Sequence, residues 1–175
     1  YFSVDDGVNF IPLNDLPKIA APPAGFVVIG GGKTGIDACL WLLENKLNPD
    51  SITWIVSREG WLLDRKNTQP AEEFFEHSIG AQAAQFEAIA QATSITDLFD
   101  RLEKEGVLVR IDKSVRPTMF HGATVSSLEL EQLRRIKNVV RMGRVQSIEN
   151  DRIILEKGIL TTSKDHVKED CSASA

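Results

Sequence analysis

Hydrophobic residues in the first third of the chain predict a β-strand, a helix and a second β-strand. An uninterrupted apolar run over residues 26–29, bounded by glycine, is typical of a strand buried on both faces of a parallel sheet. Apolar positions at helical spacing follow over residues 36–45, and the apolar run at residues 52–56 predicts the next strand. Because the connections are short, we expect a βαβ unit with a right-handed crossover.

The middle of the chain predicts three more helices. Residues 71–105 are expected to form two helices, and Ser94 with Asp97 marks the start of the second. A similar capping pattern at Ser126 opens a short helix that we expect to run through residue 135. The acidic, aromatic and alanine positions at helical spacing over residues 72–91 favour a packing helix over a recognition element.

The last third of the chain changes to a period of two, which is typical of strands. Its apolar segments, separated by turn residues, predict a small antiparallel β-meander over residues 139–142, 145–148, 153–155 and 159–161. We expect residues 107–109 to return to the parallel sheet and residues 167–171 to form a final strand. The proline-rich residues 1–25 predict an extended lead-in or linker.

The fold class expected from these elements is α/β. It is a Rossmann-like parallel sheet flanked by helices, with the meander near the C-terminus, and residues 26–175 form a single NAD(P)-binding domain. The length of 175 residues and the 42% hydrophobic content fit one domain.

Composition and charge narrow the function classes. A net charge of -5 argues against binding nucleic acid or an anionic membrane surface. Cys39 and Cys171 form no CxxC pair and the histidines show no ligand spacing, so we expect no metal site. Cys39 lies on the apolar face of the first predicted helix and is expected to be a core residue. The sequence has no membrane-length apolar run and no signal-peptide pattern, so a soluble cytoplasmic protein is expected. Because the first residue is Tyr1 and not Met, we expect a piece of a longer polypeptide.

A glycine-rich turn carries the clearest chemistry. Gly30, Gly32 and Gly35 have the GxGxxG spacing between a predicted strand and a predicted helix, the context that indicates dinucleotide binding. Such glycines permit a tight turn, a close approach of pyrophosphate to backbone amides, and close packing of the helix on the strand. The helix N-terminus can then hold an anion without a net basic charge. The alternative is that the glycines form only a tight connection, and a nucleoside-triphosphate loop is rejected because Val27 stands where it requires glycine.

The end of the second predicted strand indicates which nucleotide is bound. An NAD site usually has an acidic residue there to accept ribose hydroxyls, whereas a 2′-phosphate calls for arginine and small donors. Ser57 and Arg58 follow the strand, so NADP is favoured over NAD. Two alternatives stay open: Arg58 is a solvated surface residue, or the adjacent Glu59 pairs with it or serves a ribose instead.

These segments resemble the NADPH-binding domain of FAD-dependent pyridine-nucleotide oxidoreductases, especially those similar to flavin-containing monooxygenases. The resemblance covers most of the chain and is least diagnostic over residues 66–125. The segments that carry it are VVIGGGKTGIDACLWLLE at 27–44, ITWIVSREGWLLDR at 52–65 and KEDCSASA at 168–175.

The resemblance implies an NADPH site and a partner domain for FAD. It implies that the pyrophosphate is lined by Gly30, Gly31, Gly32, Lys33, Thr34 and Gly35. It places Ser57 and Arg58 at the 2′-phosphate, and it implies that Asp170–Ala173 returns the chain to an FAD-binding domain of the same polypeptide. Only one dinucleotide fingerprint is present, so FAD is expected to be held by the rest of the parent protein, where NADPH delivers hydride to it.

We therefore expect the NADPH-binding domain of a flavin-dependent oxidoreductase, with monooxygenation of a small-molecule substrate favoured. No catalytic residue is predicted within the chain. The alternative is a non-catalytic NAD(P)-sensing module. A stand-alone dehydrogenase with a Ser-Tyr-Lys mechanism is excluded because the only tyrosine is Tyr1.

Overall fold

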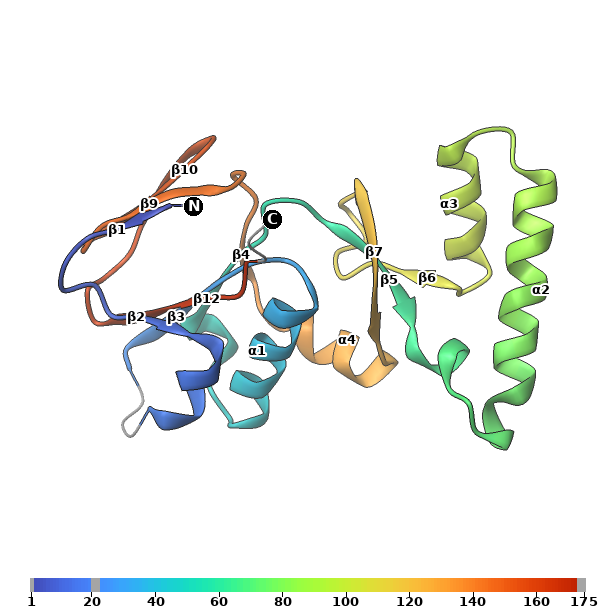
Figure 1. Cartoon of the computed structure of the whole chain (residues 1–175), viewed down its shortest axis with the longest axis horizontal. Coiled ribbons are helices and arrows are strands. Elements are labelled where there is room, and N and C mark those ends of the chain that lie inside the picture. The colour runs from blue at the N-terminus through green and yellow to red at the C-terminus, as the bar shows by residue number, and fades with distance from the viewer. Residues whose placement is uncertain (1, 20–22, 173–175) are drawn as a thin grey trace. The chain divides into compact units, whose positions relative to one another are not determined.

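The computed structural model of the chain describes residues 2–19 and 23–172, which form two compact units (Figure 1). Unit 1 contains the chain up to Glu59 and again from Gln132 onward, and unit 2 is the intervening segment Gly60–Glu131. The structure thus differs from the single domain expected over residues 26–175. The reason is that the chain, after leaving the βαβ unit, builds a separate small sheet with its own helices.

Unit 1 is built on a five-stranded sheet in which every neighbouring pair of strands is parallel. Its strands are, in spatial order, β2 (Phe10–Pro12), β12 (His166–Asp170), β3 (Gly25–Ile29), β4 (Ile52–Ile55) and β8 (Asn138–Val140). The predicted βαβ unit is confirmed, because α1 (Lys33–Glu44) connects the paired strands β3 and β4. The general α/β class and the final strand β12 are also confirmed. All residues of β3 are buried, as expected for a strand covered on both faces.

A four-stranded sheet covers one face of the parallel sheet. It consists of β1 (Ser3–Val4), β9 (Val145–Ile148), β10 (Arg152–Leu155) and β11 (Gly158–Thr161). The last three strands are antiparallel, which confirms this part of the predicted meander. The core between the sheets contains Val27, Ile29, Ile55, Ile148, Ile153 and Leu155. Figure 1 shows α1 on the opposite side of the parallel sheet.

Two predictions for unit 1 need correction. The sequence predicts Val139 and Val140 as part of the meander, but they pair in parallel with β4. The prediction is wrong because an apolar strand pattern does not say whether the strand pairs in parallel or antiparallel. The expected lead-in, residues 1–25, instead supplies β1, β2 and a 3-10 helix at Leu13–Lys18 with Leu16 buried. Tyr1 and residues 20–22 lie outside the described residues. A further 3-10 helix in unit 1 is Pro49–Ser51.

Unit 2 has a three-stranded sheet and helices of its own. The sheet order is β6 (Leu108–Val109), β5 (Gly60–Asp64) and β7 (Met119–Val125). The predicted return of residues 107–109 to the parallel sheet is wrong, because β6 pairs antiparallel with β5. The two helices predicted over residues 71–105 are confirmed as α2 (Phe75–Gln91) and α3 (Ile95–Lys104). Short 3-10 helices lie at Arg65–Thr68 and Glu72–Phe74.

The predicted helix caps are confirmed. The Ser94 hydroxyl accepts a hydrogen bond from the Asp97 N–H at 3.1 Å at the start of α3. At the start of α4 (Ser127–Leu133), the Ser126 hydroxyl accepts from the Glu129 N–H at 3.2 Å, and the Glu129 carboxylate accepts from the Ser126 N–H at 2.6 Å. This is a reciprocal capping box. The helix ends at Leu133, two residues before the predicted end.

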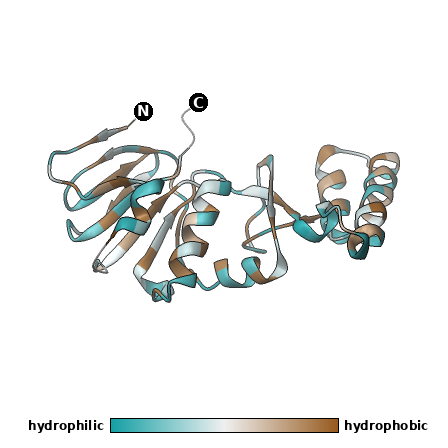
Figure 2. Ribbon diagram, turned by 60° about the horizontal axis from the view of Figure 1, so that its bottom comes forward, coloured by the Kyte–Doolittle hydropathy of each residue, from teal (hydrophilic) through white to brown (hydrophobic). Residues whose placement is uncertain are grey.

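Hydrophobic and hydrophilic residues alternate around the helices, as Figure 2 shows. This distribution is typical of helices that pack one side against a sheet or another helix. Within residues 2–19 and 23–172, no helix is sufficiently long and apolar to cross a bilayer.

Candidate functional site

The turn between β3 and α1 is fastened to both neighbouring strands. The Gly30 N–H donates to the Ile55 carbonyl of β4 at 2.9 Å, and the Cys171 N–H donates to the Ile29 carbonyl at 2.8 Å. The indole N–H of Trp54 donates to the Gly30 carbonyl at 2.8 Å. These hydrogen bonds fix the turn at the carboxyl edge of the sheet. Trp54 is buried, so the indole that makes this hydrogen bond is part of the core.

Two of the three fingerprint glycines are required by the backbone itself. Gly30 has φ +127°, and a Cβ there would lie 2.6 Å from the Cys171 carbonyl oxygen. A Cβ at Gly35 would lie 2.0 Å from the Gly30 carbonyl oxygen. Both distances are far below van der Waals contact, so neither position accepts a side chain without moving backbone. The close approach of α1 to β3 therefore depends on these glycines.

Gly32 differs from the other two glycines. A Cβ built there meets no protein atom within 4 Å, and its φ of -84° and ψ of -174° are accessible to any residue. Neither steric crowding nor backbone conformation therefore requires glycine at this position. Glycine is required here only if something outside the described chain approaches the backbone.

The N-terminus of α1 presents backbone N–H groups beside this open position. Gly32 is the N-cap residue and makes no side-chain capping bond, and its carbonyl accepts the first helical hydrogen bond, from Ile36, at 3.0 Å. The first N–H groups of an α-helix have no carbonyl partner within the helix. Thr34 is exposed, and the Lys33 ammonium forms an ion pair with Asp37 one turn further on. The N-cap residue of α1 therefore has no side chain that bonds to the first N–H groups of the helix.

The loop after β4 lies next to the glycine turn. A Cβ at Gly31 would lie 2.7 Å from a methyl carbon of Val56 and 3.4 Å from the Arg58 carbonyl oxygen. Both Ser57 and Arg58 are exposed. The structure therefore brings together the two predicted groups of cofactor-binding residues, Gly30–Gly35 and Ser57–Arg58, at one edge of the parallel sheet.

An ion pair that sequence reasoning missed holds the same loop. The Arg141 Nε lies 2.7 Å from a Glu59 carboxylate oxygen, and the Glu59 side chain is only 9% exposed. Arg141 comes directly after β8, which is the strand next to β4. The sequence predicts a meander strand over residues 139–142, which contains Arg141, so nothing in the sequence pointed to this ion pair.

A buried carboxyl group lies on β12, near the same edge. Glu169 is fully buried, and neither of its carboxyl oxygens has a hydrogen-bond partner among the described residues. The adjacent Lys168 does not neutralise it, because successive side chains of a strand point to opposite faces and Lys168 donates to the Ser163 carbonyl. Burial raises the pKa of Glu169 to about 7, and the Cys171 thiol beside it acts in the opposite direction.

The cysteines next to Glu169 are poor nucleophiles. Cys39 and Cys171 are both buried free thiols, and burial raises the pKa of each. A raised thiol pKa lowers the reactive thiolate fraction. The prediction that Cys39 is a core residue is confirmed. Within the described part of the chain, no cluster of three or more His, Cys, Asp or Glu residues could hold a metal ion.

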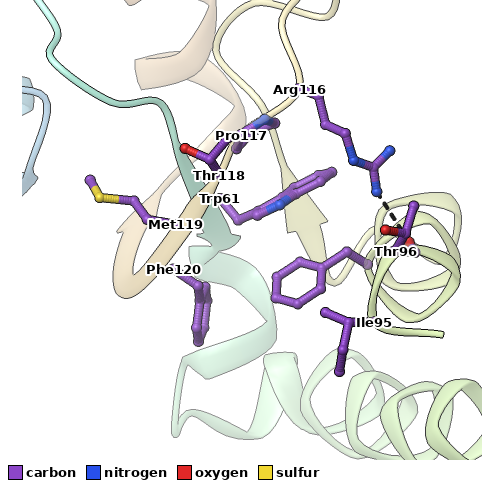
Figure 3. A pocket seen from close by; sticks show the side chains of 9 residues that line it. Trp61, Ile95, Thr96, Arg116, Pro117, Thr118, Met119 and Phe120 are labelled. Atoms are coloured by element: carbon purple, nitrogen blue, oxygen red, sulfur yellow. Dashed lines mark hydrogen bonds between the residues drawn. The ribbon is translucent and has the colours of Figure 1, made fainter. Parts of the chain in front are cut away.

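Unit 2 contains a separate small cavity of about 220 Å³ (Figure 3). It is lined by Trp61, Ile95, Thr96, Phe99, Arg116, Pro117, Thr118, Met119 and Phe120. Trp61 lies at the centre of an aromatic and cationic cluster on one side of this cavity. The structure places its ring 5.5 Å from that of Phe99, with the guanidinium carbons of Arg110 and Arg116 at 5.4 and 5.8 Å from its centroid. The guanidinium groups next to the Trp61 ring therefore belong to arginines of unit 2 itself.

The chain is similar to uncharacterized proteins of Mycobacterium bovis (strain AF2122/97) and Mycobacterium tuberculosis (strain H37Rv). Each is 50% identical over 172 residues, which cover 98% of this chain and 32% of the relative. The chain thus spans about a third of the length of the curated relatives it matches. No family model matches the chain, and no solved structure matches it at a significant level. The names of the relatives assign no activity, so a function must be argued from the site.

Substituting the buried Glu169 should change how stability depends on pH. A pKa raised from 4.5 to about 7 in the folded state means that the folded protein binds the proton more tightly than the unfolded chain. The contribution of Glu169 to stability is then fully present below pH 4.5 and is lost as pH rises to about 7. In Glu169→Gln, the decline of unfolding free energy across this window should be shallower by up to about 1.4 kcal/mol per pH unit.

Urea unfolding at several pH values measures this slope. The slope is the appropriate readout because a buried amide without partners carries its own cost at every pH. The exposed carboxylate of the same unit, changed in Asp165→Asn, serves as the matched control. Equal slopes for the wild type and Glu169→Gln would show that Glu169 does not titrate in this window.

Proposed function

We propose that this chain is the NADPH-binding domain of an FAD-dependent oxidoreductase, with unit 1 as a Rossmann-like nucleotide-binding fold. The observation that carries the proposal is the open position at Gly32 beside the uncapped start of α1. A pyrophosphate seated there would accept hydrogen bonds from backbone N–H groups and benefit from the helix dipole. The net negative charge of the chain does not oppose this, since the donors are local.

The strand order supports the same assignment. Counted along the chain from the glycine turn, β3, β4, β8 and β12 are four successive strands of the parallel sheet, and in space they run β8-β4-β3-β12. This corresponds to the order 3-2-1-4 of dinucleotide-binding sheets, in which ligands bind outside the carboxyl ends of the strands where the order reverses. The reversal lies between β3 and β12, at Gly30 and Cys171.

Ser57 and Arg58 are the proposed ligands of the adenosine 2′-phosphate. They are exposed, follow β4 and lie next to the glycine turn. A guanidinium can bind two phosphate oxygens at once, and the serine hydroxyl adds a donor without crowding. Lys33 and Thr34, on the first turn of α1, complete the proposed contacts to the diphosphate.

The flavin chemistry is proposed for the longer polypeptide. FAD held by the rest of the polypeptide would supply the redox chemistry, and this chain would bind the nucleotide and orient its nicotinamide toward the flavin. The relatives are about three times as long as the matched segment, which leaves room for an FAD-binding domain. A cytoplasmic location and a small-molecule substrate, with monooxygenation favoured, complete the proposal. Both cysteines are free thiols, as in a reducing compartment.

Alanine at Gly32 separates nucleotide binding from folding. Because its methyl group would meet no protein atom within 4 Å, Gly32→Ala should still fold, and the less favourable alanine at the N-cap should lower the unfolding free energy by no more than about 1 kcal/mol. The same methyl group would lie where the pyrophosphate approaches, so the dissociation constant for NADPH should rise at least about tenfold, or about 1.4 kcal/mol. Calorimetric titration of the 175-residue chain measures it. Gly80→Ala, also unobstructed but in α2, is the control. Unchanged NADPH affinity in Gly32→Ala would contradict the proposed pyrophosphate site.

Removing the Arg58 guanidinium should affect one nucleotide selectively. A hydrogen bond to a charged group contributes about 1.5–3 kcal/mol, so Arg58→Ala should weaken NADPH binding roughly 10- to 100-fold. NADH lacks the 2′-phosphate, and its binding should change little. Arg144→Ala removes an exposed arginine of the same unit as a control for net charge. An equal loss for NADPH and NADH would overturn the assignment of Arg58 to the 2′-phosphate.

The flavin part of the proposal is tested on a full-length mycobacterial relative. The purified protein should show a flavin absorption spectrum that NADPH bleaches under anaerobic conditions, because reduced flavin loses its visible bands. NADH should bleach it more slowly. A colourless protein that still binds NADPH would reject the oxidoreductase and favour the alternative, a non-catalytic NAD(P)-sensing module.

A further inference from the structure

The ion pair between Glu59 and Arg141 lies beside the proposed 2′-phosphate site. Glu59 directly follows Arg58, and its carboxylate is 2.7 Å from the Arg141 Nε. Arg141 directly follows β8, and Glu59 lies in the loop after β4, the parallel strand next to β8. The Val56 N–H also donates to the Val140 carbonyl at 2.9 Å. The pairing of β4 with β8 therefore continues to the residue directly before Arg141.

A carboxylate at this place in a dinucleotide site has a known chemical consequence. An acidic residue after the second strand accepts hydrogen bonds from the ribose hydroxyls of NAD and repels a 2′-phosphate. Glu59 is close enough in sequence to Ser57 and Arg58 to act in that way. In the structure its side chain is 9% exposed and is engaged by Arg141, so it is turned away from this use.

The guanidinium of Arg141 also keeps Glu59 from competing for Arg58. An unpaired carboxylate next to Arg58 would attract that guanidinium and reduce its availability to phosphate. The Arg141 side chain is 30% exposed, so the pair is partly shielded from solvent. Shielding makes the pair less sensitive to salt than a surface ion pair.

We propose that Arg141 is a positioning residue that sets the preference for NADPH over NADH by holding the Glu59 carboxylate away from the adenosine ribose. This inference rests on the proposed nucleotide-binding function of unit 1. It assigns Arg141 no contact with the nucleotide. Its effect on the nucleotide preference acts through Glu59, and that distinguishes it from a second phosphate-binding arginine.

A double-mutant cycle on the 175-residue chain tests the inference. The dissociation constants of NADPH and NADH are measured for the wild type, Arg141→Gln, Glu59→Gln and the double variant. Arg141→Gln should reduce the preference for NADPH about tenfold or more, because the released carboxylate repels the 2′-phosphate and accepts the ribose hydroxyls. Glu59→Gln should keep the preference. The double variant should regain it to within about threefold of the wild type, because no carboxylate remains.

The recovery in the double variant is the readout that a merely structural role would not produce. Arg152→Gln removes an arginine from another Arg–Glu pair of unit 1, with Glu149 at 2.8 Å, and should leave the preference unchanged. If Arg141→Gln does not fold, Arg141→Lys, which keeps the charge but loses the planar fork, should shift the preference about threefold in the same direction.

The outcomes separate the inference from the function on which it rests. An unchanged preference in the Arg141 variant that folds, or a double variant as impaired as Arg141→Gln, overturns the role of Arg141 while NADPH binding by the wild type stands. A wild-type chain that binds neither NADPH nor NADH overturns the proposed function and this inference together.

Discussion

The geometry of the candidate site depends on the carbonyl group of Gly30. It accepts a hydrogen bond from the Trp54 indole, and it lies so close to Gly35 that any side chain at Gly35 would collide with it. This contact sets the distance between β3 and the start of α1. Because α1 begins so close to the strand, its free N–H groups lie at the carboxyl edge of the sheet and not behind it.

The same edge carries the loop that we assign to nucleotide selection, and that loop is held from two sides. Gly31 has no side chain to separate the turn from Val56 and the Arg58 backbone, and Arg141 holds Glu59 from the β8 side. The chain leaves unit 1 immediately after this loop and re-enters it at Gln132. Unit 2 is thus inserted between β4 and β8, which are still neighbours in the parallel sheet.

Local features could be predicted from the sequence because their determinants are close together along the chain. The strand-turn-helix around Gly30–Gly35, the capping residues Ser94 and Ser126, and the core position of Cys39 each follow from residues within about one or two turns of structure. Strand partners could not be predicted in the same way. Residues 139–140 and 108–109 have the alternation or apolar character of strands, but nothing in their own pattern says which strand they pair with.

The wrong partner for β8 also concealed part of the candidate site. With β8 assigned to the meander, nothing in the sequence places Arg141 near the loop after β4. Only the parallel pairing of β8 with β4 puts it beside Glu59. The glycine turn, Ser57 and Arg58 were identified because they lie within one βαβ unit, and the Glu59–Arg141 pair was missed because its residues are 82 positions apart.

The central claim is that the backbone N–H groups at the start of α1 bind a nucleotide diphosphate. Amide chemical shifts of the ¹⁵N-labelled chain, followed by NMR during titration with NADPH, test it most directly. The account requires the largest saturable shifts at Gly31, Gly32, Lys33 and Thr34. Saturable binding that leaves these four amides unmoved, with shifts confined to residues elsewhere, would contradict it.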